Sequence, residues 1–98
     1  MTLRVDPERN EVQALKQALD WRGLDVLEIG CGDGRLTRRL AALGARMRAI
    51  DPDAALVRAA RRGVAPKDRP RVRFRVGRAG RLEYPAAAFD AIVLSWSL

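Results

Sequence analysis

Three glycines, each separated from the next by one residue, follow directly after a short apolar run. They are Gly30, Gly32 and Gly34, and the run before them, residues 25–29, is typical of a buried strand. Leucines at helical spacing begin two residues after the last glycine. In open parallel sheets, ligands bind beyond the carboxyl ends of strands, where glycine lets the backbone turn sharply and leaves room for a ligand. We therefore expect this turn to bind a ligand through its backbone.

An aspartate, Asp51, ends the next segment that is expected to form a strand. A carboxylate in that position can accept hydrogen bonds from both hydroxyls of a ribose, as in several classes of nucleoside-containing cofactor. The alternative is that Asp51 only begins a turn before Pro52, since Asp-Pro is a common turn signal. Because the glycines stand at the end of the preceding strand, we favour ribose binding.

The spacing of the glycines bears on which cofactor is bound. Dinucleotide-binding turns have the pattern G-x-G-x-x-G, and Arg35 stands where that pattern has its last glycine. S-adenosylmethionine has no phosphate, so its turn needs only backbone room beside the methionine part. A carboxylate such as Glu28 suits a ligand with sulfonium and ammonium charges, and it can also hydrogen-bond the amides of the loop. The spacing favours the sulfonium cofactor, and a fragment of an NAD-dependent oxidoreductase remains the alternative.

Strands and helices are expected to alternate, which indicates an α/β fold with a parallel sheet wound by right-handed crossovers. Asp6 and Pro7 favour a helix start and predict a helix over residues 6–22. In one strand Val72, Phe74 and Val76 alternate with arginines, a pattern typical of an edge strand. The expected strands are residues 25–29, 45–50, 72–76 and 89–96. Further helices are expected between Gly34 and Gly44 and after the capping residue Asp53, the last with Leu56, Val57 and Ala60 on its buried face.

Residues 28–34, Glu-Ile-Gly-Cys-Gly-Asp-Gly, resemble the first motif of class I S-adenosylmethionine-dependent methyltransferases. Asp51 resembles that family's ribose-binding acid, and residues 77–79 stand where the family has its adenine-contacting loop. Residues 89–98 resemble the fourth strand and the segment after it, in the style of quinone-biosynthesis and other small-molecule methyltransferases. The resemblance implies a Rossmann-like, doubly wound parallel sheet of order 3-2-1-4 that is truncated after the fourth strand. Residues 1–98 would form a partial cofactor-binding domain, with the helix 6–22 before a core of residues 24–98.

The resemblance also implies which residues bind S-adenosylmethionine. The backbone of the turn and the Glu28 carboxylate would hold the methionine part, and Asp51 would hold the ribose. Ser95 would lie near the transferable methyl group, as would Trp96, for which core packing is an equal alternative. Pro52 and Asp53 would line the adenine pocket, and the Ala79 amide would reach the adenine ring. The implied cofactor-binding residues are Glu28, Gly30, Cys31, Gly32, Gly34, Asp51, Pro52, Asp53, Arg78, Ala79 and Ser95.

Arg78 departs from the family's pattern, which has an acidic or amide side chain there to accept a hydrogen bond from the adenine amino group. An arginine side chain has no acceptor. It can instead stack on the adenine face through a cation–π contact worth about 0.5–2 kcal/mol, or point into solvent. We therefore expect weakened cofactor binding.

No residue is assigned as catalytic. Methyl transfer is an in-line displacement at a carbon that the sulfonium already activates, so positioning and electrostatics can supply much of the catalysis. The sequence contains no histidine, the commonest general base. We expect a small-molecule acceptor, and we expect this chain to be a fragment that is inert alone. The segment Ile92–Leu94 would then be an unpaired apolar edge through which the chain could self-associate.

The net charge of +7 comes almost wholly from arginine, spread along the chain without a dense block. This distribution favours an arginine-rich soluble surface over a nucleic-acid-binding module, which is kept as an alternative. The single cysteine, Cys31, excludes an intramolecular disulfide. No apolar run approaches the ~20 residues of a membrane span, and the charged N-terminal segment is unlike a secretory signal. A cytoplasmic location is therefore expected.

Overall fold

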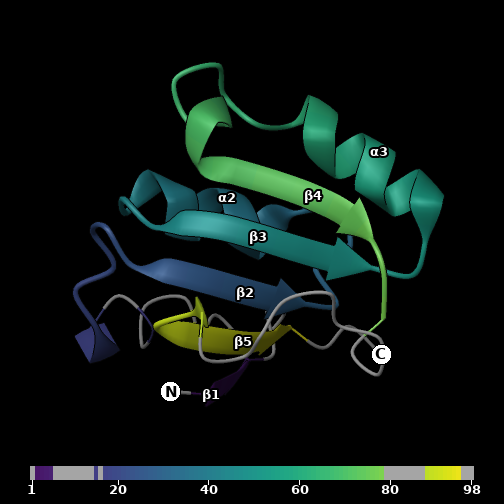
Figure 1. The fold of residues 1–98 in the computed structure, drawn as a ribbon. Coiled ribbons are helices and arrows are strands. Elements are labelled where there is room, and N and C mark those ends of the chain that lie inside the picture. The colour runs from purple at the N-terminus through teal and green to yellow at the C-terminus, as the bar shows by residue number, and fades with distance from the viewer. Residues whose placement is uncertain (1, 6–14, 16, 79–87, 96–98) are drawn as a thin grey trace.

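The computed structural model describes residues 2–5, 15, 17–78 and 88–95. Over this part of the chain the strands form one parallel sheet of order β1-β5-β2-β3-β4 (Figure 1). The order β4-β3-β2-β5 is the predicted order 3-2-1-4 and confirms it. The strands are β1 (Thr2–Val5), β2 (Asp25–Ile29), β3 (Arg46–Asp51), β4 (Val72–Val76) and β5 (Ala91–Ser95).

The strand β1 was not expected, and it corrects the prediction that β5 is an unpaired edge. Its backbone pairs with β5 from Thr2 opposite Ile92 to Val5 opposite Ser95. The other side of β5 pairs with β2, so β5 lies inside the sheet. Backbone groups of an apolar strand that lacks a neighbour would otherwise stay open to pairing with another chain. The proposed route to self-association through β5 is therefore wrong.

The helix predicted over residues 6–22 ends earlier than expected. Residues 6–14 and 16 lie outside the described part, and helical backbone is present at Leu15, Gln17 and Ala18 but not beyond. The indole of Trp21 turns back and donates a hydrogen bond to the Leu15 carbonyl over 2.7 Å. This bond satisfies a carbonyl near the helix end, so the chain leaves the helix before Trp21 and Gly23.

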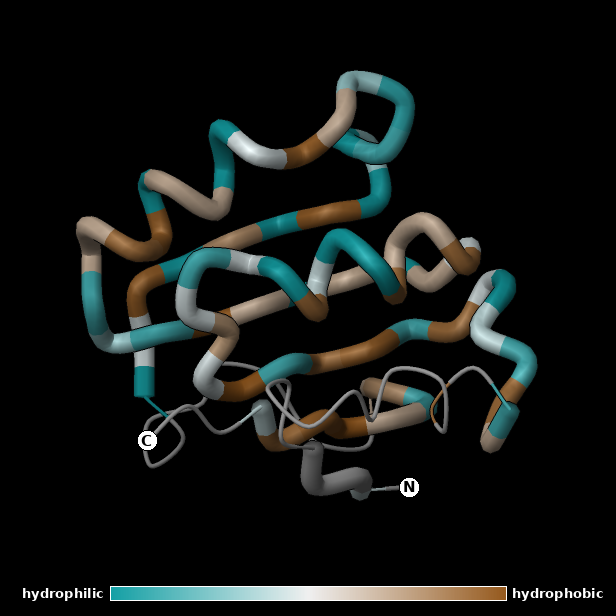
Figure 2. Tube along the Cα trace, turned by 180° about the vertical axis from the view of Figure 1, so that it is seen from behind, coloured by the Kyte–Doolittle hydropathy of each residue, from teal (hydrophilic) through white to brown (hydrophobic). Residues whose placement is uncertain are grey.

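Two helices, α2 (Arg35–Ala42) and α3 (Ala54–Arg62), cover the same face of the sheet, as Figures 1 and 2 show from opposite sides. In α2 the buried apolar residues are Leu36, Leu40 and Ala41, which fall on one side of a 3.6-residue helix. In α3 only Val57 and Ala60 are buried. Leu56 was expected in the core but is 38% exposed, because α3 lies at the edge of the sheet and buries a narrow stripe.

The edge strand β4 has the alternating pattern that the sequence predicted. Val72 and Phe74 are buried on the side of the helices, and Arg73 and Arg75 are exposed on the other side. Val76, the third apolar residue of the pattern, is 54% exposed because it lies at the end of the strand. The position of β4 at the edge is confirmed.

A partly buried ion pair that the sequence did not indicate lies just before β4, and its arginine also contacts α2. Asp68 is 8% exposed and pairs with Arg71 in the short 3-10 helix that precedes β4. The guanidinium of Arg71 also donates to the carbonyl of Ala41, over 3.0 Å, at the end of α2. The same carbonyl accepts a 2.9 Å hydrogen bond from the amide of Gly44, and a cation beside it interacts favourably with the helix dipole. None of the described helices is long and apolar enough to cross a membrane.

Candidate functional site

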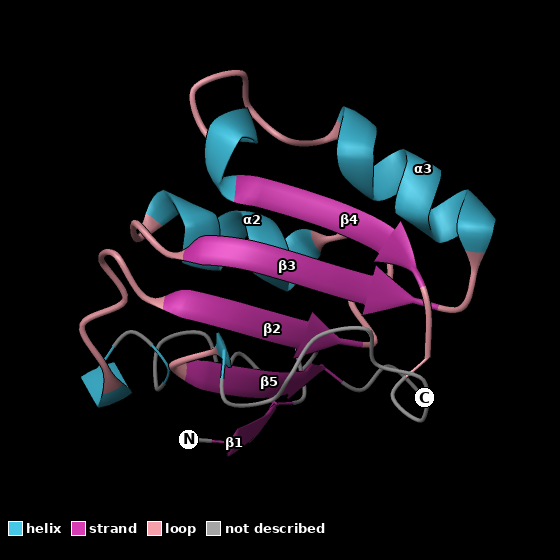
Figure 3. Cartoon of the chain, in the orientation of Figure 1, coloured by secondary structure: helices cyan, strands magenta, loops and turns pink. Residues whose placement is uncertain are grey.

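The turn after β2 continues the pairing between β2 and β3 (Figure 3). The amides of Gly30 and Cys31 both donate to the carbonyl of Ile50, over 2.9 and 3.1 Å. The turn then closes through a 3.0 Å hydrogen bond from the Gly34 amide to the Cys31 carbonyl, and α2 begins at Arg35. The turn is thereby held beside the carboxyl end of β3, where Asp51 stands.

Two of the glycines in the turn serve different purposes. Gly30 has a φ of +81°, and a Cβ on it would lie 2.5 Å from the carbonyl oxygen of Ser95 in β5. Gly32 has a φ of +56°, and no atom of the described residues lies within 4 Å of the place where its Cβ would be. Gly30 is therefore needed for close packing of the backbone. Gly32 instead borders open space on the side where a ligand can approach.

Asp51 lies directly against this turn. Its Oδ2 accepts a 2.9 Å hydrogen bond from the amide of Gly32, and its Oδ1 accepts one of 2.9 Å from the amide of Asp53. The two features that the sequence singled out are thus brought together at the carboxyl ends of neighbouring strands. A carboxylate has about four acceptor sites, so about two are not used by the hydrogen bonds of the described residues.

Glu28 lies beneath the turn and is completely buried. The hydroxyl of Thr37 in α2 donates to its Oε1 over 2.5 Å, and its Oε2 has no hydrogen-bond partner among the described residues. Burial raises the pKa of Glu28 from 4.5 to about 7. The nearby charge of Asp51 adds to this rise, and the hydroxyls of Thr37 and Ser95 oppose it. The Glu28 side chain therefore joins β2 to α2 inside the fold, and no part of it is open to solvent.

We expect replacement of Glu28 by Gln to remove a pH dependence of stability. A carboxyl with a raised folded-state pKa stabilises the fold below pH 4.5, and that contribution is lost as the pH rises to about 7. At about 1.4 kcal/mol per pKa unit, the loss approaches 3 kcal/mol. The variant's free energy of unfolding, measured in urea relative to the natural chain, should therefore rise by about this amount between pH 4.5 and pH 8. A difference that stays constant over this range would contradict the assignment.

Cys31 and Asp33, which stand between the glycines of the turn, are held by burial and by hydrogen bonds, respectively. Cys31 is buried, and burial together with the nearby Glu28 and Asp51 charges raises the pKa of its thiol to about 12. The thiol is therefore neutral at physiological pH. Asp33 is exposed, and its carboxylate accepts a 3.2 Å hydrogen bond from the amide of Arg35. Its own carbonyl accepts a 2.8 Å hydrogen bond from Arg38.

The remaining predicted residues lie after β3, after β4 and at the end of β5. Pro52 and Asp53 are exposed, and Asp53 caps α3 by accepting hydrogen bonds from two amides of its first turn. Arg78 is exposed. Ser95 is buried, and its carbonyl faces Gly30. Ala79 and Trp96 lie outside the described residues.

Sequence reasoning missed Thr37 and the carbonyls of Ile50 and Ser95. A signal existed for Thr37, because it is a polar residue next to Leu36 on the side of α2 that faces the sheet. Its hydroxyl satisfies one oxygen of Glu28, which explains why it is buried. The two carbonyls could not be found, since no side chain marks a backbone group.

A parallel sheet with a glycine turn and an acid at the ends of adjacent strands defines a Rossmann-like α/β domain. A family model described as a methyltransferase domain matches residues 26–98, and the chain belongs to this family.

Curated relatives agree. The chain is 42% identical over 71 residues to a ubiquinone biosynthesis O-methyltransferase of Methylocella silvestris, a match over 72% of this chain and 27% of that protein. It is 47% identical over 74 residues to a protein-L-isoaspartate O-methyltransferase of Methylorubrum populi, a match over 74% of this chain and 34% of that protein. The chain therefore spans about a third or less of the length of these relatives.

A solved structure shows the same fold. An S-adenosylmethionine-dependent methyltransferase from Mesorhizobium loti superposes with a TM-score of 0.74 at 24% sequence identity, over 89% of this chain and 39% of that chain.

Proposed function

We propose that this chain binds S-adenosylmethionine between the Gly30–Gly34 turn and Asp51. We further propose that the protein to which it belongs transfers the cofactor's methyl group to a small-molecule acceptor in the cytoplasm. The hydrogen bond from the Gly32 amide to Asp51 carries this proposal, because it unites the turn and the acid in one site.

The residues present fit the cofactor. The open side of Gly32 leaves room for the methionine part, and a Cβ would fill that room. The free acceptor sites of Asp51 match the two hydroxyls of a ribose, which are donors. Pro52 and Asp53, exposed just after β3, are the proposed wall of the adenine pocket. Glu28 is buried near Cys31 of the turn, and its negative form would attract the positive charges of the cofactor.

The names of the two curated relatives support a cofactor-binding role for the aligned segment. One is named for ubiquinone biosynthesis and the other for protein L-isoaspartate, so their acceptors differ in kind. Both align with about three quarters of this chain. What they share over this segment is more readily explained by a common methyl donor than by a common acceptor.

When bound, S-adenosylmethionine supplies a methyl group on a sulfonium, ready for in-line displacement. The chain's own contribution is to position the cofactor: the turn fixes one end and Asp51 fixes the ribose, which reduces the entropy that the reaction must lose. Ser95, at the end of β5, is proposed to lie near the transferable methyl group. No residue of this chain is proposed as a general base.

Thermal unfolding in the presence of candidate ligands tests this proposal. A ligand that binds only the folded state raises the melting temperature, and at 100 times its Kd it adds about 2.7 kcal/mol of stability. We expect S-adenosylhomocysteine to raise the melting temperature, and NAD and duplex DNA to leave it unchanged. Stabilisation by NAD alone would favour the oxidoreductase alternative, and stabilisation by DNA alone the nucleic-acid-binding alternative.

We expect Arg78→Asp to tighten the binding of S-adenosylhomocysteine about tenfold. The new carboxylate can accept a hydrogen bond from the adenine amino group, and a hydrogen bond to a charged group contributes about 1.5–3 kcal/mol. Isothermal titration calorimetry measures the change. Arg73→Asp, on the exposed face of β4, makes the same change in charge away from the proposed pocket and serves as the control. Equal or weaker binding by the Arg78 variant would count against this role.

A further inference from the structure

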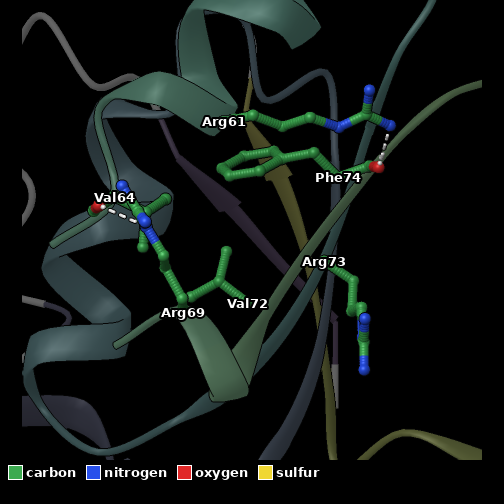
Figure 4. A pocket seen from close by; sticks show the side chains of 6 residues that line it. All are labelled: Arg61, Val64, Arg69, Val72, Arg73 and Phe74. Atoms are coloured by element: carbon green, nitrogen blue, oxygen red, sulfur yellow. Dashed lines mark hydrogen bonds between the residues drawn. The ribbon is translucent and has the colours of Figure 1, made fainter. Parts of the chain in front are cut away.

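A groove separate from the glycine turn lies between α3 and the edge strand β4 (Figure 4). Its volume is about 310 Å³, at the small end of the range for ligand pockets. None of its lining residues belongs to the proposed cofactor site. We call it the β4 groove; it is lined by Arg61, Val64, Arg69, Val72, Arg73 and Phe74.

The β4 groove combines an apolar floor with a positively charged rim. Val64, Val72 and Phe74 are between 5% and 8% exposed, so they form a packed floor. Arg61 and Arg69 form the charged rim and are exposed, and no acidic residue among those that the structure describes lines the groove. Such a surface attracts a molecule that carries both a negative charge and an apolar part.

Hydrogen bonds to backbone carbonyls hold two arginines of the groove, Arg61 in α3 and Arg69 just before β4. Arg61 lies along Phe74 and donates to its carbonyl over 2.8 Å, and Arg69 reaches the carbonyl of Val64 over 3.4 Å (Figure 4). A guanidinium has five N–H donors, so most of the donors of each side chain remain for a ligand. Because a backbone bond already restricts the Arg69 side chain, an anion that pairs with it orders it at a smaller entropic cost.

We infer that the β4 groove is a second binding site, for a small organic anion. Its carboxylate or phosphate group would pair with Arg69, and its apolar part would lie on Val72 and Phe74. A guanidinium fork matches the oxygens of either anion, so both belong to the same ligand chemistry. This inference does not depend on cofactor binding at the glycine turn.

Titrations of the 98-residue chain, followed by NMR, test the inference. The probes are phenyl phosphate and benzoate. Inorganic phosphate, which lacks the apolar part, and benzyl alcohol, which lacks the negative charge, are the control probes. We expect the two organic anions to shift the methyl signals of Val64 and Val72, and whichever binds more tightly identifies the preferred anion. Shifts centred on Gly32 and Asp51, equally tight binding of inorganic phosphate or benzyl alcohol, or no shift at all would overturn the inference.

Variants supply the second arm of the test. We expect Arg69→Met to weaken binding of the preferred anion about tenfold, because it removes a charge-assisted hydrogen bond. Arg62→Met removes an exposed arginine of α3 outside the groove, and it should leave the Kd unchanged. An equal loss in the Arg62 variant would show attraction to overall charge only and would overturn the site. The shift map of the natural chain stands even where a variant does not fold.

Discussion

Asp51→Asn is expected to weaken the binding of S-adenosylhomocysteine to this chain about 100-fold or more. The carboxylate can accept two ribose hydroxyls, and each hydrogen bond to a charged group contributes about 1.5–3 kcal/mol. An amide has one acceptor oxygen, and its NH2 group would face either a hydroxyl or the amide of Gly32, which now donates to Oδ2. Isothermal titration calorimetry on the natural and variant chains measures the loss.

The matched control for this variant is Asp33→Asn. Asp33 lies in the same turn, is exposed, and loses the same charge on substitution. Its carboxylate contacts only the amide of Arg35 among the described hydrogen bonds, so we expect its Kd to stay within about threefold of the natural value. A similar loss in both variants would mean that the turn attracts the ligand by charge alone, and it would remove Asp51 from its proposed role.

Gly30→Ala is expected to destabilise the fold by about 4 kcal/mol. A residue with a Cβ is strained at a φ of +81°, which costs about 1–3 kcal/mol. The Cβ would also lie 2.5 Å from the carbonyl oxygen of Ser95, so β2 and β5 would have to separate. Overpacking of this kind costs about 1–3 kcal/mol more. Urea unfolding measures the difference.

Gly32→Ala separates the effect of a Cβ on stability from its effect on cofactor binding. Its Cβ would contact no described atom, so the cost to stability is only the strain at a φ of +56°, about 1–2 kcal/mol. The same Cβ would enter the space proposed for the methionine part, so the variant should fold and yet lose cofactor affinity. Should Gly32→Ala bind S-adenosylhomocysteine as tightly as the natural chain, the ligand does not occupy that space.

The parts of the site that could be predicted are those encoded by local sequence. A buried strand, glycines at its end and an acid after the next strand are visible within residues 25–51, and the parallel topology then places them together. The cap at Asp53 and the edge position of β4 are of the same kind, because each follows from a pattern within a few residues.

What could not be predicted depends on contacts between distant segments. Thr2–Val5 forms a strand because its backbone pairs with that of β5, which lies about ninety residues later in the chain. The bond between Thr37 and Glu28 and the bond from Arg71 to the Ala41 carbonyl arise from packing that no short pattern records. Leu56 and Val76 fit their apolar patterns, but Leu56 lies on a helix at the edge of the sheet and Val76 at the end of its strand, so both are exposed.

The central claim is that the Gly30–Gly34 turn and Asp51 bind one adenosyl ligand together. A crystal structure of the chain with S-adenosylhomocysteine tests it most directly. We predict the ribose hydroxyls within hydrogen-bonding distance of the Asp51 carboxylate and the homocysteine part against the open side of Gly32. A ligand bound elsewhere, with Asp51 still contacting only the amides of Gly32 and Asp53, would contradict the claim.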